Sequence, residues 1–114
     1  MDNCIFCKII RKEIPSEIVF ENDSVLIIRD NNPQAPTHLL ALPKKHYAGV
    51  HLVPVSETKL FQSLFTAIGE VVKKEGLDEK SYRQIINFGE KAGQSVHHIH
   101  VHVLSGRTFA WPPG

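Results

Sequence analysis

The chain has 114 residues, so a single domain over residues 1–114 is expected, because chains divide into two domains only well above this length. Its apolar fraction of 42%, charged fraction of 22% and net charge of +1 are ordinary, and they indicate no general attraction to nucleic acid or to a membrane surface. No apolar run has the length of about 20 residues that a membrane span needs, and residues 1–15 lack the pattern of a signal peptide, so a cytoplasmic location is expected.

The first half of the chain predicts a short helix, a hairpin and a third strand. Apolar residues at helical spacing follow Cys4, and Pro15 ends the helix that they indicate. Apolar runs on either side of the turn at residues 22–24 indicate two paired strands, and a loop with two prolines precedes the third strand. The expected elements are a helix over about Cys4–Arg11, strands over residues 17–23 and 25–30, and a strand from residue 38 to Pro43.

The second half predicts one long helix and two further strands. Apolar residues spaced by three and four over residues 56–75 indicate a helix that packs on the sheet, with Ser56 as its N-cap and Gly76 as its left-handed stop. The whole pattern is typical of an α+β domain with a five-stranded antiparallel sheet, one main helix and a short N-terminal helix. The remaining expected elements are strands over residues 82–89 and 96–104 and an irregular tail from Ser105.

The two cysteines of the chain, Cys4 and Cys7, form a C-x-x-C pair. In a reducing compartment such a pair is more often half of a metal site or a redox motif than a structural disulfide. A thioredoxin-like pair is expected after a strand of a βαβ unit, and no strand is predicted before this pair. The sequence therefore favours half of a zinc site, with burial of the two thiols as small hydrophobic groups as the alternative.

Four of the seven histidines lie close together in the segment VHHIHVHVL. Because side chains alternate between the two faces of a strand, His98, His100 and His102 are expected on one face and His97 on the other, with the valines and Ile99. The apolar face is expected to pack against the main helix. The three imidazoles would then form a row on the outer face, with about 7 Å between successive ones.

Three interpretations of this row remain open. The histidines are polar residues on a solvated face, or they form a three-histidine metal site, or they act as nucleophile and acid/base groups with an ordinary pKa of about 6.5. A row is long for a single metal ion, because Zn–N bonds measure only about 2.0–2.1 Å. Catalysis is favoured over both alternatives.

The polar loop before the histidines indicates that the reacting group is a phosphate. Gly89 and Gly93 allow backbone N–H groups to approach an anion closely. Gln94 and Ser95 add side-chain donors, and Asn87 is expected on the neighbouring strand. A neutral imidazole flanked by such donors fits acyl or phosphoryl transfer.

Residues 98–104, HIHVHVL, match the H-φ-H-φ-H-φ-φ signature (φ is an apolar residue) of the histidine triad (HIT) superfamily. The likeness covers nearly the whole chain and includes IFCKIIRKEIPSEIVFEND, PQAPTHLLALPKKH, GQSV and WPPG. With its terminal WPPG, the chain most resembles the Hint branch, the histidine triad nucleotide-binding proteins, which act as purine nucleoside phosphoramidases. The resemblance implies the HIT fold, a purine nucleotide substrate, and a homodimer in which two five-stranded sheets join.

The resemblance also implies a role for each histidine of the site. His100 would attack the α-phosphorus of a nucleoside phosphoramidate or acyl nucleotide, and water would hydrolyse the resulting nucleotidyl-histidine to AMP or GMP. His102 would hydrogen-bond the phosphate, His38 would support the triad from the adjacent strand, and His98 completes the triad. No organic cofactor is implied.

The same resemblance assigns a nucleotide site around the triad. Without the resemblance, Asp30 would equally be the residue of an Asx-turn, and Ile5, Phe6 and Ile28 would be interpreted as ordinary core residues. Asn31 departs from the branch, which usually has an apolar residue against the base at this position. The implied residues are Asp30 at the ribose, Asn87, Gly93 and Ser95 at the phosphate, Ile5, Phe6 and Ile28 around the purine, and Trp111 near the partner subunit's site.

The C-x-x-C pair sets this chain apart from the animal Hint proteins, which lack it. A set of bacterial HIT proteins and the uridylyltransferases carry the pair and bind zinc. By their pattern the zinc ligands here would be Cys4, Cys7, His46 and His98, and the ion would be structural, tying the N-terminal helix to the sheet. His97 is a weaker candidate, because it is expected on the other face of its strand.

Three functions follow from these observations. The first is a hydrolase that cleaves P–N bonds through a covalent nucleotidyl-histidine. The second is a dinucleoside polyphosphate hydrolase, against which the WPPG tail counts. The third is a non-catalytic nucleotide-binding regulatory protein, which has no need of an intact triad. The sequence favours the first.

Overall fold

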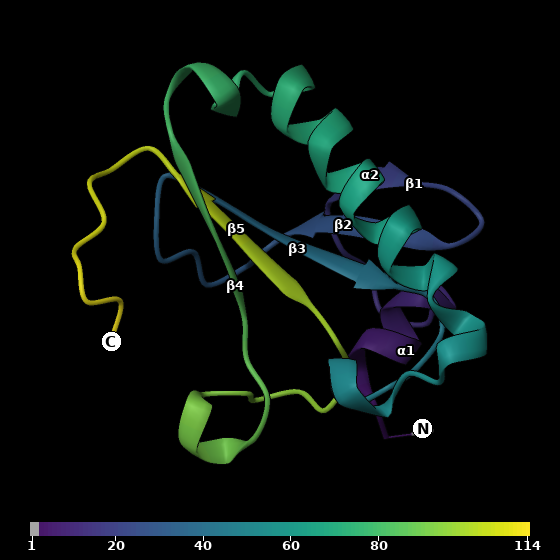
Figure 1. The fold of residues 1–114 in the computed structure, drawn as a ribbon. Coiled ribbons are helices and arrows are strands. Elements are labelled where there is room, and N and C mark those ends of the chain that lie inside the picture. The colour runs from purple at the N-terminus through teal and green to yellow at the C-terminus, as the bar shows by residue number, and fades with distance from the viewer. Residues whose placement is uncertain (1–2) are drawn as a thin grey trace.

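The structure, a computed structural model that describes residues 3–114, contains one antiparallel sheet of five strands. The strand order is β1-β2-β3-β5-β4, so β1 and β4 form the two edges of the sheet (Figure 1). The strands are β1 (Ile18–Glu21), β2 (Val25–Arg29), β3 (Thr37–Pro43), β4 (Tyr82–Ile86) and β5 (Val101–Ser105). The helices are α1 (Ile5–Ile10) and α2 (Lys59–Lys74), with short 3-10 helices at Val50–Leu52, Val55–Glu57, Leu77–Glu79 and Glu90–Ala92.

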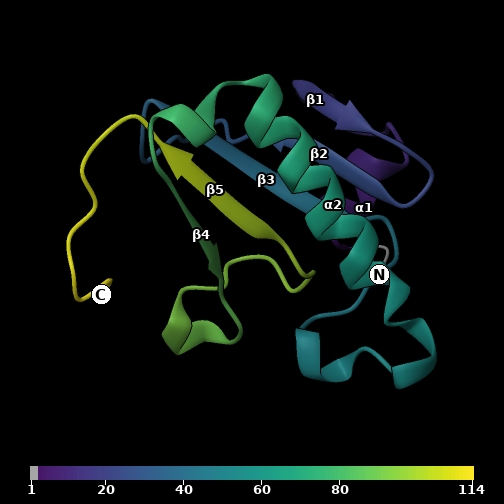
Figure 2. The ribbon, with the colours of Figure 1, turned by 45° about the horizontal axis from the view of Figure 1, so that its top comes forward.

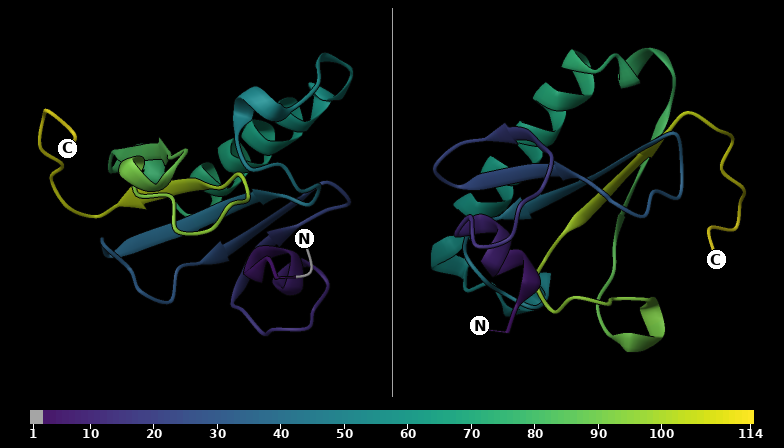
Figure 3. Two further views of the ribbon diagram at one scale, coloured as in Figure 1. Left: turned by 90° about the horizontal axis from the view of Figure 1, so that it is seen from below. Right: turned by 180° about the vertical axis from the view of Figure 1, so that it is seen from behind.

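The two α-helices lie on opposite faces of the sheet. α2 runs across one face (Figure 2), and the short α1 covers part of the other, as the view along the sheet shows (Figure 3). This arrangement confirms the predicted α+β fold, with its five-stranded antiparallel sheet, one main helix and a short N-terminal helix. Within residues 3–114, no helix has the length and apolar character needed to span a membrane.

The central strands are apolar on both faces because each face is covered by a helix. On β2, Val25 and Ile27 pack toward α2, whereas Leu26 and Ile28 pack toward α1. Two cores result. The α2-side core includes Ile99, Val101 and Val103, as predicted, and the smaller α1-side core consists of Phe6, Ile9, Leu26, Ile28, Leu40 and Leu42.

The face that carries the histidine triad is not an outer face, and the prediction was wrong on this point. His98 is fully buried and His100 is only 4% exposed, while His102 is partly exposed. His97, predicted to share the buried apolar face, is exposed instead. The triad is covered because α1 docks over it through residues such as Phe6, which packs in the α1-side core.

The last strand is shorter than predicted, because it begins at Val101 rather than at residue 96. Its partner β3 ends at Pro43, which has no N–H to donate to a sheet. The Pro43 carbonyl instead accepts a hydrogen bond from His98 Nε2 at 2.8 Å, and the Ile99 N–H donates to a carbonyl in the loop after β3 at 2.7 Å. The first two triad histidines therefore precede the strand.

The main helix ends as predicted but begins later. α2 starts at Lys59, and Ser56 lies in the separate 3-10 helix Val55–Glu57, so it does not cap α2. Thr58 occupies the N-cap position without a side-chain hydrogen bond. At the other end, Gly76 has φ of 72°, the left-handed conformation that glycine adopts without a Cβ clash.

Candidate functional site

A cavity of about 380 Å³ lies on the α1 side of the sheet. Its walls include Ile5, Phe6 and Ile28, the three side chains predicted to surround a purine. Polar groups line the same cavity, among them His100 and His102. Four further apolar residues of the wall were not predicted from the sequence, namely Ile9, Ile14, Leu40 and Val96. Helical spacing from Phe6 identifies Ile9, and strand alternation from Leu42 identifies Leu40, but nothing local identifies the other two.

The ring of His100 is held in one orientation by its backbone and by a neighbouring ring. Its Nδ1 donates a hydrogen bond to the carbonyl of His98 at 2.7 Å, since a carbonyl can only accept. The neutral imidazole then carries its basic lone pair on Nε2. The Phe6 ring packs against it in a T-shaped contact, with 4.9 Å between centroids. His100 thus lines the cavity with Nε2 as its available nucleophilic nitrogen.

A chain of hydrogen bonds sets the tautomer of His102. The Gln34 N–H donates to His38 Nδ1 at 3.0 Å, so neutral His38 has its proton on Nε2. That Nε2–H donates to His102 Nδ1 at 2.9 Å, which places the proton of neutral His102 on its own Nε2. His102 therefore offers an N–H donor next to His100, whose ring centroid lies 4.9 Å away.

Asp30 joins this chain and also shapes the turn that follows β2. Its Oδ1 accepts a hydrogen bond from the Asn32 N–H at 2.8 Å, which is the Asx-turn weighed from the sequence. Its Oδ2 lies 3.4 Å from His38 Nε2, and the residue lines the cavity. Asp30, His38 and His102 are close enough to hold a metal, but the proton on His38 Nε2 and the engaged Nδ1 make this cluster a hydrogen-bond relay.

Burial keeps the site histidines neutral. Loss of solvation, together with the neighbouring His100 and His38, lowers the pKa of His102 to about 4, and the Asp30 carboxylate opposes part of this shift. Burial also lowers the pKa of His100 and of His38 below the ordinary 6.5, and the Asp30 carboxylate opposes part of each shift. At neutral pH the site therefore presents one unprotonated nucleophile and one uncharged donor.

These lowered pKa values predict a stability that falls in mild acid. A group whose pKa is lower in the folded than in the unfolded chain binds protons preferentially in the unfolded state, so stability is full above pH 6.5 and declines toward pH 4. Urea unfolding of wild type should show this decline, and His102→Asn, which cannot titrate, should show a shallower one. Equal pH slopes for the two proteins would contradict the assignment.

The predicted phosphate donors of the loop are placed differently from one another. Ser95 lines the cavity and is exposed, whereas Gln94 is buried. The Gln94 carboxamide is occupied, because Oε1 accepts from the Gly89 N–H at 2.9 Å and Nε2 donates to the Ala48 carbonyl at 2.7 Å. Gln94 therefore braces the loop. Asn87 follows β4 rather than lying on it, and neither Asn87 nor Gly93 lines the cavity.

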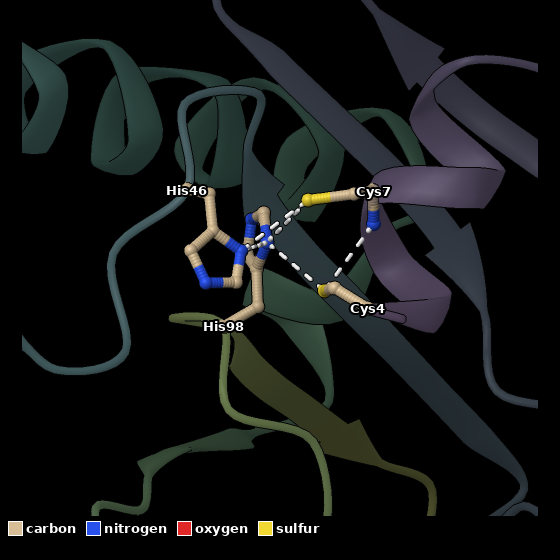
Figure 4. A group of neighbouring side chains, drawn as sticks. All are labelled: Cys4, Cys7, His46 and His98. Carbon is tan, nitrogen blue, oxygen red and sulfur yellow. Dashed lines mark hydrogen bonds between the residues drawn. The ribbon is translucent and has the colours of Figure 1, made fainter. Parts of the chain in front are cut away.

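Beside the cavity, two cysteines and two histidines from three separate segments meet (Figure 4). Cys4 and Cys7 come from the N-cap and first turn of α1, His46 from the loop after β3, and His98 from the segment before β5. His98 Nδ1 lies 3.6 Å from both Sγ atoms, and His46 Nδ1 lies 3.3 Å from Cys7 Sγ and 3.1 Å from His98 Nδ1. The predicted metal ligands thus converge on one point.

These separations match a tetrahedral zinc site. Zn–S bonds of about 2.3 Å and Zn–N bonds of about 2.0–2.1 Å place a sulfur and a nitrogen about 3.6 Å apart, and two nitrogens about 3.4 Å apart. The Nε2–H of His98 donates to the Pro43 carbonyl, which leaves Nδ1 unprotonated and aimed at the cysteines. The residues present therefore fit a Cys₂His₂ site, and both thiols are free.

The C-terminal tail lies away from this cavity. Trp111 is 82% exposed and does not line it. The tail is attached to the edge strand β4, because Arg83 Nη1 donates to the Ala110 carbonyl at 2.9 Å. A larger hollow of about 690 Å³ next to the tail is lined by Lys80, Arg83 and Arg107, among other residues, and contains no histidine.

The fold and the buried triad define the class to which the chain belongs. The model of the HIT domain family matches residues 11–109, and the chain belongs to that family. A 14 kDa zinc-binding protein of Zea mays is 48% identical over 112 residues, which span 96% of this chain and 87% of the maize protein. The recognition of a histidine triad protein from its sequence is thereby confirmed.

Solved structures of HIT proteins are also similar to this chain. The crystal structure of a HIT family hydrolase from Legionella pneumophila superposes with a TM-score of 0.93 and 46% identity, covering 98% of this chain and 100% of that one. A histidine triad nucleotide-binding protein from Candida albicans superposes with a TM-score of 0.84 and 32% identity, covering 96% of this chain and 83% of that one.

Proposed function

We propose that the protein is a nucleotide hydrolase of the Hint type, which cleaves nucleoside 5′-phosphoramidates or acyl nucleotides and releases a nucleoside monophosphate. The observation that carries this proposal is the tautomeric state of the triad. His100 presents a bare Nε2 and His102 a neighbouring N–H in one cavity. A site that only bound a nucleotide would not need an oriented nucleophile.

The chemistry follows from these two nitrogens. His100 Nε2 attacks the α-phosphorus, the P–N or P–O bond to the leaving group breaks, and a nucleotidyl-histidine forms. The leaving group departs with the electron pair of the broken bond, and an amine takes up a proton from solvent. The His102 N–H hydrogen-bonds a phosphoryl oxygen and stabilises the charge that develops there. Water then attacks the same phosphorus and gives up a proton to solvent, the bond from phosphorus to His100 Nε2 breaks with its electron pair returning to the imidazole, and the nucleoside monophosphate leaves.

The walls of the cavity suit a purine nucleoside. Ile5, Phe6 and Ile28 provide an apolar surface for the base, and the Asp30 carboxylate is available for the ribose hydroxyls. Ser95 lines the same cavity, and its hydroxyl is the proposed hydrogen-bond donor to the phosphate. Asn31 also lines the cavity and adds a polar amide where the branch usually has an apolar side chain, so base preference is expected to differ from that of the branch.

The test compares two substrates on the same enzyme. AMP release from an adenosine 5′-phosphoramidate should exceed AMP release from a diadenosine polyphosphate in kcat/KM by at least about 100-fold, which corresponds to about 2.7 kcal/mol of transition-state stabilisation. Preference for the diadenosine compound would favour the dinucleoside polyphosphate hydrolase. Turnover of neither, with AMP bound, would favour the regulatory protein.

We also propose that Cys4, Cys7, His46 and His98 hold a structural zinc ion. The support is the fit of their separations to tetrahedral zinc and the zinc-binding relative in maize. The bound ion would join α1 to the sheet by linking segments that are far apart in the sequence. The free thiols of the ligands agree with a reducing, cytoplasmic location.

Metal analysis of two histidine variants tests the ligand set. Wild-type protein and His97→Ala should each carry about one zinc ion per chain, as a single four-ligand site requires. His46→Ala should lose most of it, because only three ligands remain. His97 is the matched control, since it lies next to a ligand in sequence but is exposed. Loss of zinc from His97→Ala and not from His46→Ala would exclude the proposed set.

For the assembly, we propose a homodimer that joins two sheets along β4. This edge strand exposes Tyr82 and Ile86, each about 40% accessible, and the tail with Trp111 lies on the same side. The other edge, β1, is short and interrupted by an irregularity in its pairing. Light scattering should give twice the monomer mass for wild type and the monomer mass for Ile86→Lys, which places a charge on the edge. A wild-type monomer would refute the dimer.

A further inference from the structure

We infer that the cluster of Cys4, Cys7, His46 and His98 orients the nucleophile His100, with His98 as the positioning residue that links the two sites. The inference rests on the proposed function for its kinetic consequence, but its structural content can be tested separately. Two contacts carry it: the main-chain carbonyl of His98 and the ring of Phe6.

The first contact joins His98 directly to the nucleophile. The His98 ring is fully buried and held at both nitrogens, by the Pro43 carbonyl at 2.8 Å and by the cysteine sulfurs 3.6 Å away. The main-chain carbonyl of the same residue accepts the 2.7 Å hydrogen bond from His100 Nδ1. A change in the position of the His98 ring therefore moves the group that sets the tautomer of His100.

The side chain of His98 is an important anchor because the main chain around it does not pair with the sheet. His98 and His100 precede β5, so no ladder of hydrogen bonds to β3 or β4 fixes their main chain. The Ile99 N–H bonds a loop carbonyl at 2.7 Å, and the His98 N–H bonds only the nearby Val96 carbonyl. The side chain of His98 thus supplies much of the constraint on this segment.

The second contact runs through α1. Phe6 lies in the sequence between Cys4 and Cys7, and its ring packs on His100 at 4.9 Å and on His98 at 6.0 Å between centroids. A helix of six residues is too short to be stable alone, so its position depends on its anchors. Metal ligation by the two cysteines would therefore hold Phe6 against the nucleophile as one wall of the cavity.

Both contacts predict the same consequence of losing the metal. His98 and α1 would lose their common anchor, the bond from His100 Nδ1 would weaken, and the tautomer with the proton on Nε2 would become populated. That tautomer has no lone pair on the nitrogen that lines the cavity. We expect kcat to fall by about 10–100-fold, the usual effect of losing a hydrogen-bond partner that orients a functional imidazole.

The experiment uses full-length protein with ¹⁵N-labelled histidine. In the zinc-loaded protein the His100 resonances should show a protonated Nδ1 and a bare Nε2. After chelation they should show a mixture of tautomers, with kcat reduced in parallel, while the His51 ring, which packs on Phe88, should not change. Cys4→Asp, whose carboxylate can ligate zinc, should recover the loaded state on addition of zinc, and Cys4→Ala should not.

Each outcome separates this inference from the proposed function. Metal-free protein that stays folded by circular dichroism with an unchanged His100 tautomer and kcat would overturn the inference. If the metal-free chain unfolds, the zinc-loaded protein is compared with a cadmium-loaded one, because the larger cadmium ion should shift the position of His98. Identical His100 resonances in these two proteins would then overturn the inference. If wild type hydrolyses no phosphoramidate, the proposed function fails, and the resonances alone decide the inference.

Discussion

His100→Ala is expected to lower AMP release from an adenosine phosphoramidate by about 10³-fold or more, because the substitution removes the imidazole nitrogen whose lone pair is available in the cavity. His102 carries a proton on the nitrogen that would have to attack. AMP affinity should change by less than about tenfold, or 1.4 kcal/mol, since the apolar walls and Asp30 remain.

The matched control for this experiment is His97→Ala. It removes an exposed imidazole from the same segment without touching the cavity, so its turnover should equal that of wild type. Mass spectrometry of acid-quenched wild type should show a nucleotidyl adduct on the peptide that contains His100, and the variant should show none. Equal turnover of His100→Ala and wild type would eliminate the covalent mechanism.

Removal of the proposed zinc ion is expected to lower the melting temperature by at least about 10 °C. Four side chains on three segments meet at the site, so loss of the ion would remove a link between these segments. Each kcal/mol of lost folding stability shifts the melting temperature of a domain of this size by about 4–8 °C, so a loss of a few kcal/mol is enough. Because α1 covers the α1-side core, release of α1 from the sheet would also expose buried apolar surface, including Phe6 and Leu40.

The measurement is a thermal melt before and after treatment with a strong chelator, followed by re-addition of zinc. Recovery of the original melting temperature with zinc, and not with magnesium, would identify the site, because magnesium prefers oxygen ligands. His46→Ala should melt near the temperature of the chelated wild type, and chelation should change it little. Metal-free wild type with full thermal stability would rule out a structural ion.

The amino-acid sequence by itself determined the fold class and the family, and it supplied the candidate reacting groups. The continuous apolar runs of β2 and β3, the three-and-four spacing in α2 and the glycine at residue 76 are local patterns, and each specifies its element through side-chain hydrophobicity, side-chain periodicity or backbone conformation. The alternation of histidine with apolar residues likewise placed Ile99, Val101 and Val103 in the α2-side core.

Tertiary structure decided what the histidines face and how their protons are arranged. The strand pattern suggested an outer row of imidazoles, but the sequence carries no local signal that a six-residue helix docks on that face. Nor does any local pattern reveal that Pro43, at the end of β3, takes a hydrogen bond from the His98 ring instead of pairing with the next strand. His98 and His100 therefore leave the sheet, and their rings are directed to different sites.

The same distinction applies to the polar groups around the triad. The Gln94 side chain has an N–H group of the kind that binds phosphate. In the structure its amide instead hydrogen-bonds Gly89 and Ala48, which lie in two loops that are distant in sequence. The proton positions on His38 and His102 depend on the Gln34 N–H, a main-chain group whose direction follows from the turn after Asp30. Residue types specify which chemistry is available, but hydrogen-bond direction and burial depend on contacts between segments that only the folded chain brings together.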